Sequence, residues 1–502
     1  MTENKFNLIE EKWIPAADRG LVSIRDIFTD TTITDLGGDA VQKISIMKLL
    51  LAIAQSAWTP ADEQEWNSFG IQGMSRKVLQ YLEINHDSFW LYGDKPFLQM
   101  PAIVKADRKS FGCVLPMIAY GNSTILNSSQ IERALNDADR ALALIQQSSF
   151  ALGGKKTDNT IVLSPGYTGK NNAEGKPSTG RPGPGLAFMG LLHSFILGSS
   201  LIESIWINIF TSEQITKMEI YPEGVGIAPW ETMPEGEDDS IARKLKDSYM
   251  GRLIPLSRFM LIKQDGIHYS EGILHKNYLE GVVDPSVAVN FNSKKTIVLW
   301  ADTEKRPWRQ LPALLSFMQQ RTGSFKCMQL GMTMKRLGHF PVFTLWSGGM
   351  RVRSNAGEQY LSGTDDFIES EIQLSGAIFG ESSLFIETLN QEMEAMDGVS
   401  KSLWGRISSY HKDLKVDGKE IANKGTGDYW QLCERLFQEL VDTCSTAPDQ
   451  AKEYRNKYLQ FAFIVYDKYC HNQSARQMEA WAANRFGFDK SLLEDKKEAK
   501  IK

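Results

Sequence analysis

A cluster of basic residues between Lys305 and Gly357 is the clearest chemical signal in the sequence. This segment has no Asp or Glu, although the whole chain has 61 acids in 502 residues. Its basic residues are Lys305, Arg306, Arg309, Arg321, Lys326, Lys335, Arg336, Arg351 and Arg353. The chain has a net charge of −5, so the rest of it is far more acidic than the total suggests. A local excess of positive charge in an acidic protein predicts a site for a polyanion such as nucleic acid.

The end of this segment has the pattern of a β-hairpin. Residues 346–360 read Trp-Ser-Gly-Gly-Met-Arg-Val-Arg-Ser-Asn-Ala-Gly-Glu-Gln-Tyr. Alternation along a strand puts Met350 on one face and Arg351 and Arg353 on the other. Asn355 and Gly357 supply the turn, because both residue types tolerate positive φ. Such a thin cationic tip is suited to a nucleic-acid groove, although an ordinary solvated hairpin has the same pattern.

A second basic stretch, residues 153–185, is rich in glycine and proline. It opens with Gly153, Gly154, Lys155 and Lys156, where a bare backbone could approach a polyanion beside two cations. It lacks the G-K-[ST] ending of a nucleotide-binding P-loop. A long loop of this composition is either functional or a mobile surface loop, and the sequence leaves both readings open.

Metal and nucleophile chemistry has little support in the sequence. The five cysteines form no C-x-x-C pair, and the seven histidines are scattered. His86-Asp87 is a dipeptide found in metal-dependent phosphohydrolases, but without further ligands at suitable spacing we interpret it as a polar pair at a helix end. The residues therefore point to neither a thiolate zinc site nor a metal-dependent phosphohydrolase site, and we predict no metal and no cofactor.

Apolar periodicity indicates which elements position these residues. Helical spacing predicts helices over 44–58, 74–84 and 131–147, and an Asp-Gly turn predicts a hairpin over 258–269. A second hairpin is expected over 287–300. Residues 186–210 are strongly apolar but interrupted by polar side chains, so we predict a buried helix and not a membrane span.

The C-terminal part of the chain has helical apolar stripes throughout. They cover residues 365–396, 429–446 and 449–486, which predicts an antiparallel helical bundle. Cys433 and Cys444 share the apolar face of their helix and are expected to be core thiols. The polar N-terminus lacks the apolar region of a signal peptide, so we expect a cytoplasmic protein without membrane contact.

An ordered set of short motifs resembles one known family. The set comprises Asn7-Leu8-Ile9 with Lys12-Trp13-Ile14-Pro15, then Phe89-Trp90-Leu91-Tyr92 with Lys95-Pro96-Phe97-Leu98-Gln99, the glycine loop at 152–156, Gly348-Gly349-Met350-Arg351 and the helical C-terminus. In this order and over nearly the full length, it resembles the CasA family, the large subunits of the type I-E CRISPR surveillance complex Cascade. No single motif is specific; the order of the set carries the resemblance.

The resemblance implies a fold and a set of partners. The implied fold class is α+β, with a large mixed N-terminal domain over residues 1–362 and an all-α four-helix bundle over residues 363–502. Such subunits have no catalytic site. They bind the protospacer-adjacent motif on target double-stranded DNA, help to open the duplex for R-loop formation, and recruit a separate helicase–nuclease. Their other partners are the crRNA and the backbone and small subunits of Cascade.

Particular positions acquire implied roles from the same resemblance. The glycine loop falls on Gly153 and Gly154, followed by Lys155 and Lys156, and the motif-reading lysine falls at or within two residues of Lys276. The wedge hairpin corresponds to Arg351 together with Arg353, Ser354, Asn355, Ala356 and Gly357. Leu126 and Asn127 correspond to the loop that contacts the crRNA 5′ handle.

Two other classes of function stay open from the residues alone. One is a metal-dependent nucleic-acid-processing enzyme, which requires converging carboxylates or histidines. The other is a purely structural scaffold in a ribonucleoprotein, for which duplex affinity would depend little on salt.

Overall fold

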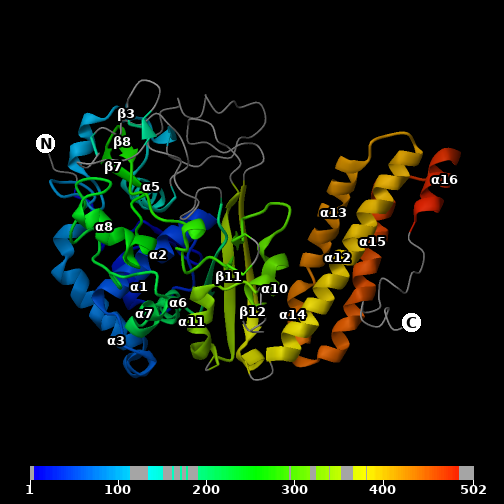
Figure 1. Ribbon diagram of the computed structural model, residues 1–502, viewed down its shortest axis with the longest axis horizontal. Coiled ribbons are helices and arrows are strands. Elements are labelled where there is room, and N and C mark those ends of the chain that lie inside the picture. Colours follow the sequence, from blue (N-terminus) through cyan, green and yellow to red (C-terminus); the bar gives the residue numbers. More distant parts are fainter. Residues whose placement is uncertain are drawn as a thin grey trace. The chain divides into compact units, whose positions relative to one another are not determined.

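The computed structural model describes residues 5–113, 134–150, 161–162, 170–171, 177–178, 190–292, 295–316, 324–338, 340–351, 366–379 and 382–485 (Figure 1). The chain forms two compact units. Unit 1 takes Met1–Pro307, Phe325–Arg336 and Thr344–Glu371, and unit 2 takes Trp308–Ser324, Leu337–Phe343 and Ile372–Lys502. The predicted domain boundary between residues 362 and 363 stays a prediction.

Unit 1 mixes helices of different lengths with small antiparallel sheets. Its helices are α1 (Ile24–Thr29), α2 (Ala40–Ala57), α3 (Glu63–Ile84), α5 (Asp137–Ser149), α6 (Leu201–Asn208), α7 (Ser212–Lys217), α8 (Ser240–Lys246), α9 (Met250–Leu253) and most of α11 (Met328–Leu337). Its shorter strands are β1 (Ile14–Ala16), β2 (Gly20–Val22), β3 (Arg108–Lys109), β4 (Lys170–Asn171), β5 (Pro177–Ser178), β9 (Val289–Asn290) and β10 (Ile297–Val298). The longer strands are β6 (His193–Leu197), β7 (Arg258–Lys263) and β8 (Gly266–Glu271), and β11 (Val342–Arg351) and β12 (Asp366–Ser375) begin or end beyond the bounds of the unit.

Helix α2 is the central helix of the unit 1 core. It begins with a capping box, in which the Asp39 carboxylate accepts from the Gln42 amide and the Gln42 side chain accepts from the Asp39 amide. The helix is long and apolar enough to cross a membrane, but 78% of it is buried inside the protein. A helix that is apolar on all sides and covered by other elements is a core helix.

Both predicted hairpins of unit 1 are confirmed. Strands β7 and β8 pair antiparallel around Gln264 and Asp265, and Gly266 takes a φ of 157° at the start of β8. Strand β3 completes this sheet in the order β3-β8-β7. Strands β9 and β10 also pair antiparallel, with Val298 opposite Val289. Lys276 lies in the segment between β8 and β9. Because this segment connects the two hairpins, each of its ends is held by a hairpin.

The prediction of one buried helix over 186–210 is wrong. The described part of this segment is a strand, β6, followed by helix α6, whose N-cap is Ser200. Strand β6 pairs antiparallel with β11, and all five of its side chains are buried. A strand covered on both faces has no alternation in polarity, so its apolar run cannot be distinguished from a buried helix by periodicity.

The predicted helix over 365–396 is wrong in its first part. Residues Asp366–Ser375 are strand β12, and the helix α12 begins only at Ser382. Ile368, Ile372 and Leu374 are buried, with the exposed side chains of Glu371 and Gln373 between them, which is the two-residue period of a strand. The sheet order is β12-β11-β6, so the basic segment ends in a strand pair that sits in a three-stranded sheet.

Unit 2 contains the predicted helical C-terminus. Its helices are α10 (Leu311–Leu314), α12 (Ser382–Asp413), α13 (Lys419–Glu434), α14 (Phe437–Thr446), α15 (Tyr454–Tyr469) and α16 (Ala475–Asn484). Helices α12, α13 and α15 pack side by side (Figure 1). The predicted helix over 429–446 is in fact the end of α13 and the whole of α14. The fold class, α+β with a helical C-terminal region, is confirmed.

The core of unit 2 includes the predicted core thiols. Cys433 and Cys444 are both fully buried, and burial raises the pKa of each thiol to about 12. Cys327 in unit 1 and Cys470 in unit 2 are also buried, each with a pKa of about 12 for the same reason. These four thiols are structural apolar groups at neutral pH.

A partly buried carboxylate in unit 1 makes stability depend on pH. Burial raises the pKa of Asp35 from 3.8 to about 6, and the nearby Glu369 and Glu371 add to the rise. The folded state therefore binds a proton that the unfolded chain releases between about pH 4 and 6, so stability falls as pH rises through this window.

Asp35→Asn removes this cost, because the side chain is then neutral at every pH and still offers an oxygen to the Leu36 amide. We expect the free energy of unfolding to rise by about 2 kcal/mol at about pH 7.5 and to change little near pH 4. Thermal unfolding of the two proteins across this pH range measures the difference. A difference that is the same at every pH would contradict the prediction.

Candidate nucleic-acid interface

The loop that carries Lys276 runs along the surface of unit 1 between β8 and β9. Side chains alternate at its start: Ile273 and His275 are buried, while Leu274 is 58% exposed. The Lys276 side chain is 59% exposed. Leu279, further along, is 66% exposed. The loop therefore presents one cation flanked by two apolar side chains to the solvent.

Local hydrogen bonds fix the shape of this loop. Asn277 begins a 3-10 turn, Tyr278–Glu280, with a capping box: its side chain accepts from the Leu279 amide and the Glu280 carboxylate accepts from its backbone. Gly281 ends the turn with a φ of +83°, a conformation that favours glycine. The Val282 amide then returns to the Asn277 carbonyl. The residues after Lys276 thus form a closed turn.

His275 anchors the loop from below. Its Nε2 donates to the Pro255 carbonyl at 2.8 Å, which makes Nε2 the protonated nitrogen. Burial lowers the pKa of His275 to about 3, with the Arg252 guanidinium adding to the effect. The imidazole ring is therefore uncharged at neutral pH. Its hydrogen bond to Pro255 holds the backbone next to Lys276 in place.

Among the residues that the structure describes, Lys276 has one weak ion pair. Its Nζ lies 3.6 Å from Asp247 Oδ1, and both side chains are substantially exposed. An exposed pair of this kind contributes about 0–1 kcal/mol to stability. The ammonium group can therefore exchange Asp247 for an external acceptor at little cost.

Arg351 lies at the end of β11 and is held against the protein. Its Nη1 donates to the Ala301 carbonyl at 3.2 Å and lies 3.7 Å from Asp302 Oδ1, with 23% of the side chain exposed. Met350, its neighbour, is 2% exposed, so the predicted alternation of these two side chains is confirmed. Arg351 is braced at the base of the predicted wedge hairpin.

All of the other predicted site residues lie outside the described part of the chain. They are Leu126, Asn127, Gly153, Gly154, Lys155, Lys156, Arg353, Ser354, Asn355, Ala356 and Gly357. Their implied roles stay predictions. Lys276 and Arg351 are the two predicted site residues whose surroundings the structure describes.

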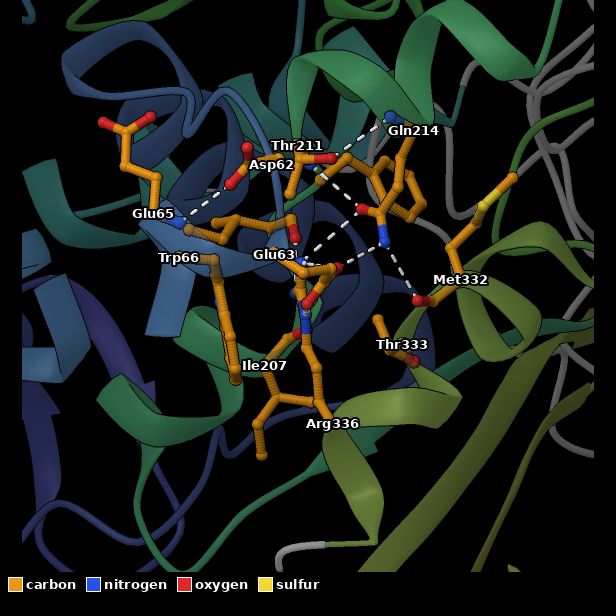
Figure 2. A network of polar contacts seen from close by, with 12 residues as sticks. Asp62, Glu63, Glu65, Trp66, Ile207, Thr211, Gln214, Met332, Thr333 and Arg336 are labelled. Atoms are coloured by element: carbon orange, nitrogen blue, oxygen red, sulfur yellow. Dashed lines mark hydrogen bonds and ion pairs between the residues drawn. The ribbon is translucent and has the colours of Figure 1, made fainter. Parts of the chain in front are cut away.

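The idea that all the basic residues of 305–357 form one cationic surface is wrong. Arg336 is 1% exposed and points into unit 1. Its Nε and Nη2 donate to the Glu63 carboxylate, and its Nη1 donates to two backbone carbonyls at 2.6 Å each (Figure 2). Arg309 belongs to unit 2, where its guanidinium lies 3.6 Å from the centre of the Trp430 ring. These two arginines hold the fold together, because a planar cation can satisfy buried oxygens and stack on indole.

The structure also identifies residues that the sequence analysis missed. Lys48, Arg252 and Asp284 are nearly fully buried and meet beneath the Lys276 loop. No spacing signal could have revealed them, because Lys48 and Asp284 are separated by 236 residues in the chain. A charged residue inside the apolar helix α2 was the one available hint, since a buried lysine requires a partner.

The His86-Asp87 dipeptide lies at a helix end, as interpreted from the sequence. It begins a 3-10 turn, His86–Phe89, directly after α3, and the Asp87 side chain is fully exposed. His86 Nδ1 and Asp87 Oδ1 are 3.7 Å apart. Within the described ranges, no group of three His, Cys, Asp or Glu residues is arranged to hold a metal ion.

The fold and the site together define a class of protein. It is an α+β protein with a helical C-terminal region, and it presents an exposed lysine on a surface loop of its mixed unit. The chain matches the family model for the CRISPR-associated protein Cse1 over residues 7–463. The chain therefore belongs to the Cse1 family, and its sequence-based recognition as a CasA of the type I-E Cascade is confirmed.

Solved structures show the same fold. Thermus thermophilus CasA (Cse1) superimposes with a TM-score of 0.72 at 19% identity, over 96% of this chain and 97% of that one. Thermobifida fusca Cse1 gives 0.67 at 18% identity, over 96% and 94%. A structure described as a CRISPR RNA-guided surveillance complex gives 0.70 at 15% identity, over 98% and 100%. No curated protein sequence gives a significant match.

Proposed function

We propose that this chain is the DNA-recognition subunit of a crRNA-guided antiviral complex. It binds the protospacer-adjacent motif on duplex DNA, promotes strand opening and R-loop formation, and recruits a separate helicase–nuclease. The observation that carries the proposal is an outward-pointing Lys276, on a loop closed by local hydrogen bonds, in a chain that belongs to the Cse1 family.

The chemistry of the loop suits a short motif. In an RNA-guided complex, base pairing with the guide carries most of the sequence information, so the protein needs only a few contacts to bases. The minor groove offers mainly acceptor atoms, and a lysine ammonium carries three donors. Lys276 supplies donors on a fixed backbone, and the predicted glycine loop at Gly153 and Gly154 would add backbone amides.

The remaining parts of the proposal concern opening and assembly. The tip from Arg353 to Gly357 acts as the wedge between bases, with Arg351 at its base. Leu126 and Asn127 contact the crRNA handle. The partners are crRNA, target duplex, the other Cascade subunits and the helicase–nuclease, in the cytoplasm. The chain itself is non-catalytic and needs no cofactor. A Cse1-like fold within an RNA-guided surveillance complex supports the RNA and subunit partners.

Lys276→Ala tests the motif assignment. The complex is reconstituted with one guide and mixed with duplexes that share the guide-matched target and carry randomised flanking bases. Sequencing of the bound fraction gives the preference among flanks. We expect the variant to lose about tenfold in preference for the best flank, because one good polar base contact is worth about 1–3 kcal/mol.

Lys217→Ala is the matched control, since Lys217 is an exposed lysine of the same unit, also paired with one acid. It should leave the preference unchanged. An equal loss of affinity for every flank in Lys276→Ala would make Lys276 a plain phosphate contact and would contradict base recognition.

A further inference from the structure

A buried charged network lies directly beneath the Lys276 loop. Arg252, in the short helix α9, is 0% exposed, and its Nη2 donates to the Lys276 backbone carbonyl at 2.9 Å. This bond holds the backbone of Lys276 itself and leaves the lysine side chain outside. The position of this guanidinium depends on how the backbone of Arg252 is itself held.

Helix α2 holds the backbone carbonyl of Arg252. Lys48 Nζ donates to the Arg252 carbonyl at 3.0 Å and also forms an ion pair with Asp284. The side chains of Lys48 and Asp284 are 4% and 2% exposed. One lysine of the core helix thus connects α9, beneath the start of the loop, to Asp284, near the end of the loop.

Buried hydrogen bonds also hold the end of the loop, at residues 283–286. Asp284 Oδ1 accepts from the Ser286 amide at 3.0 Å and from the Ser286 hydroxyl at 2.7 Å. Ser286 Oγ lies 2.8 Å from Nδ1 of the buried His193 in β6. The Tyr221 hydroxyl donates to the Val283 carbonyl at 3.1 Å. Burial alone would raise the pKa of Asp284, but Lys48 and the hydrogen bond from Ser286 hold it at about 2.

The two anchors bracket the exposed part of the loop. The exposed stretch begins at Lys276, whose carbonyl accepts from Arg252. It ends at Val283, whose carbonyl accepts from Tyr221. Between them, the capped turn at Asn277 makes no use of the solvent-facing Lys276 side chain. A recognition group is effective only if its backbone is held within a fraction of an ångström.

We propose that Arg252 is a positioning residue for Lys276: with Lys48 and Asp284 as its support, it fixes the loop backbone so that the ammonium group meets bases at one depth and angle. The inference rests on the proposed function of Lys276. It adds that the selectivity of the loop depends on buried residues that touch no nucleic acid.

Arg252→Lys tests this role with the least disturbance to the fold. Lysine keeps the charge but lacks the planar fork, so the bond to the Lys276 carbonyl is lost or weakened. In the flank-selection experiment, we expect the preference for the best flank to fall about fivefold, with total binding to guide-matched DNA nearly unchanged. Hydrogen exchange of the Val282 amide, which donates to Asn277, should be faster in the variant.

Arg336→Lys is the matched control. Arg336 is also a buried arginine of unit 1, but its partners are Glu63 and carbonyls of residues 207 and 209. It should lower thermal stability without changing the flank preference or the exchange of Val282. Equal changes in both variants would overturn the proposal, because the effect would then follow from general loss of stability.

Two further arms separate the inference from the function it rests on. If Lys276→Ala loses the preference and Arg252→Lys keeps it, the positioning role is overturned and the function stands. If Lys276→Ala keeps the preference, the proposed function of Lys276 is contradicted, and the positioning role of Arg252 is contradicted with it. Should Arg252→Lys not fold, Tyr221→Phe decides, since it removes the hydroxyl that holds Val283 and that also interacts with the Arg252 side chain. It should lower the preference about twofold and speed local exchange; no change in either overturns the proposal.

Discussion

Arg336→Met is expected to lower the free energy of unfolding of unit 1 by about 3 kcal/mol or more. The side chain reaches the Glu63 carboxylate and the carbonyls of Ile207 and Ile209, and its guanidinium lies 4.2 Å from the centre of the Trp66 ring (Figure 2). Methionine fills part of the volume but donates no hydrogen bond. Two buried carbonyls then lose their donor, and Glu63 loses its counter-charge.

The position of Glu63 determines how large the loss is. Its side chain is 33% exposed, so water can solvate part of the carboxylate after the substitution. The carbonyls of residues 207 and 209 are on buried residues and cannot be reached in the same way. Most of the cost therefore comes from unsatisfied backbone oxygens, at about 1–3 kcal/mol each.

Urea unfolding, followed by tryptophan fluorescence, measures this loss. Arg25→Met is the control, because Arg25 makes a comparable two-pronged bond to Glu10 at the surface, with the two side chains 34% and 42% exposed. It should cost less than about 1 kcal/mol. Equal losses in the two variants would contradict the argument that burial sets the value of an arginine–carboxylate pair.

Replacing Ser354–Gly357 by a shorter turn is expected to slow strand opening about 10- to 100-fold while leaving initial capture of the duplex nearly intact. Separating one base step costs a few kcal/mol, which the wedge tip would offset by contact with the exposed bases. Under the proposed function, capture depends instead on phosphate contacts and on Lys276, which the shorter turn leaves unchanged. The prediction follows from the proposed role of the tip beyond Arg351.

Opening is measured by the reactivity of unpaired thymines in the target duplex, and capture by binding at low temperature. Arg351→Gln provides the comparison, since it alters the base of the hairpin and keeps the tip. It should weaken binding mildly and leave opening largely intact. Opening at the normal rate in the shortened variant would exclude a wedge at this position.

The parts of the fold with local signals were predictable from the sequence. The Asp265-Gly266 pair marks a hairpin because glycine and aspartate suit the turn, and β7 and β8 form around it. The buried thiols Cys433 and Cys444 were predictable because they share the apolar face of a helix. The ordered family motifs pointed to Lys276 or a residue within two of it; Lys276 is exposed, and its role stays a prediction.

Features that depend on distant partners were not predictable. Strand β6 is buried on both faces by elements from other parts of the chain, so its residues have no alternating pattern. Arg336 looked like a surface cation because its partner Glu63 lies 273 residues away in the sequence. The anchors of the Lys276 loop, Arg252 and Asp284, depend on contacts of the same long-range kind. Composition counts charges, but it does not say which ones face water.

The buried cysteines make it possible to label the Lys276 loop selectively with a fluorescent dye. With a pKa of about 12, Cys327, Cys433, Cys444 and Cys470 have almost no thiolate at neutral pH and should be silent toward maleimide dyes. Once Cys113 is replaced by serine, a single cysteine placed at the exposed Leu279 would be the one reactive thiol in the native protein. A fluorophore there would report, in real time, when the loop meets its target.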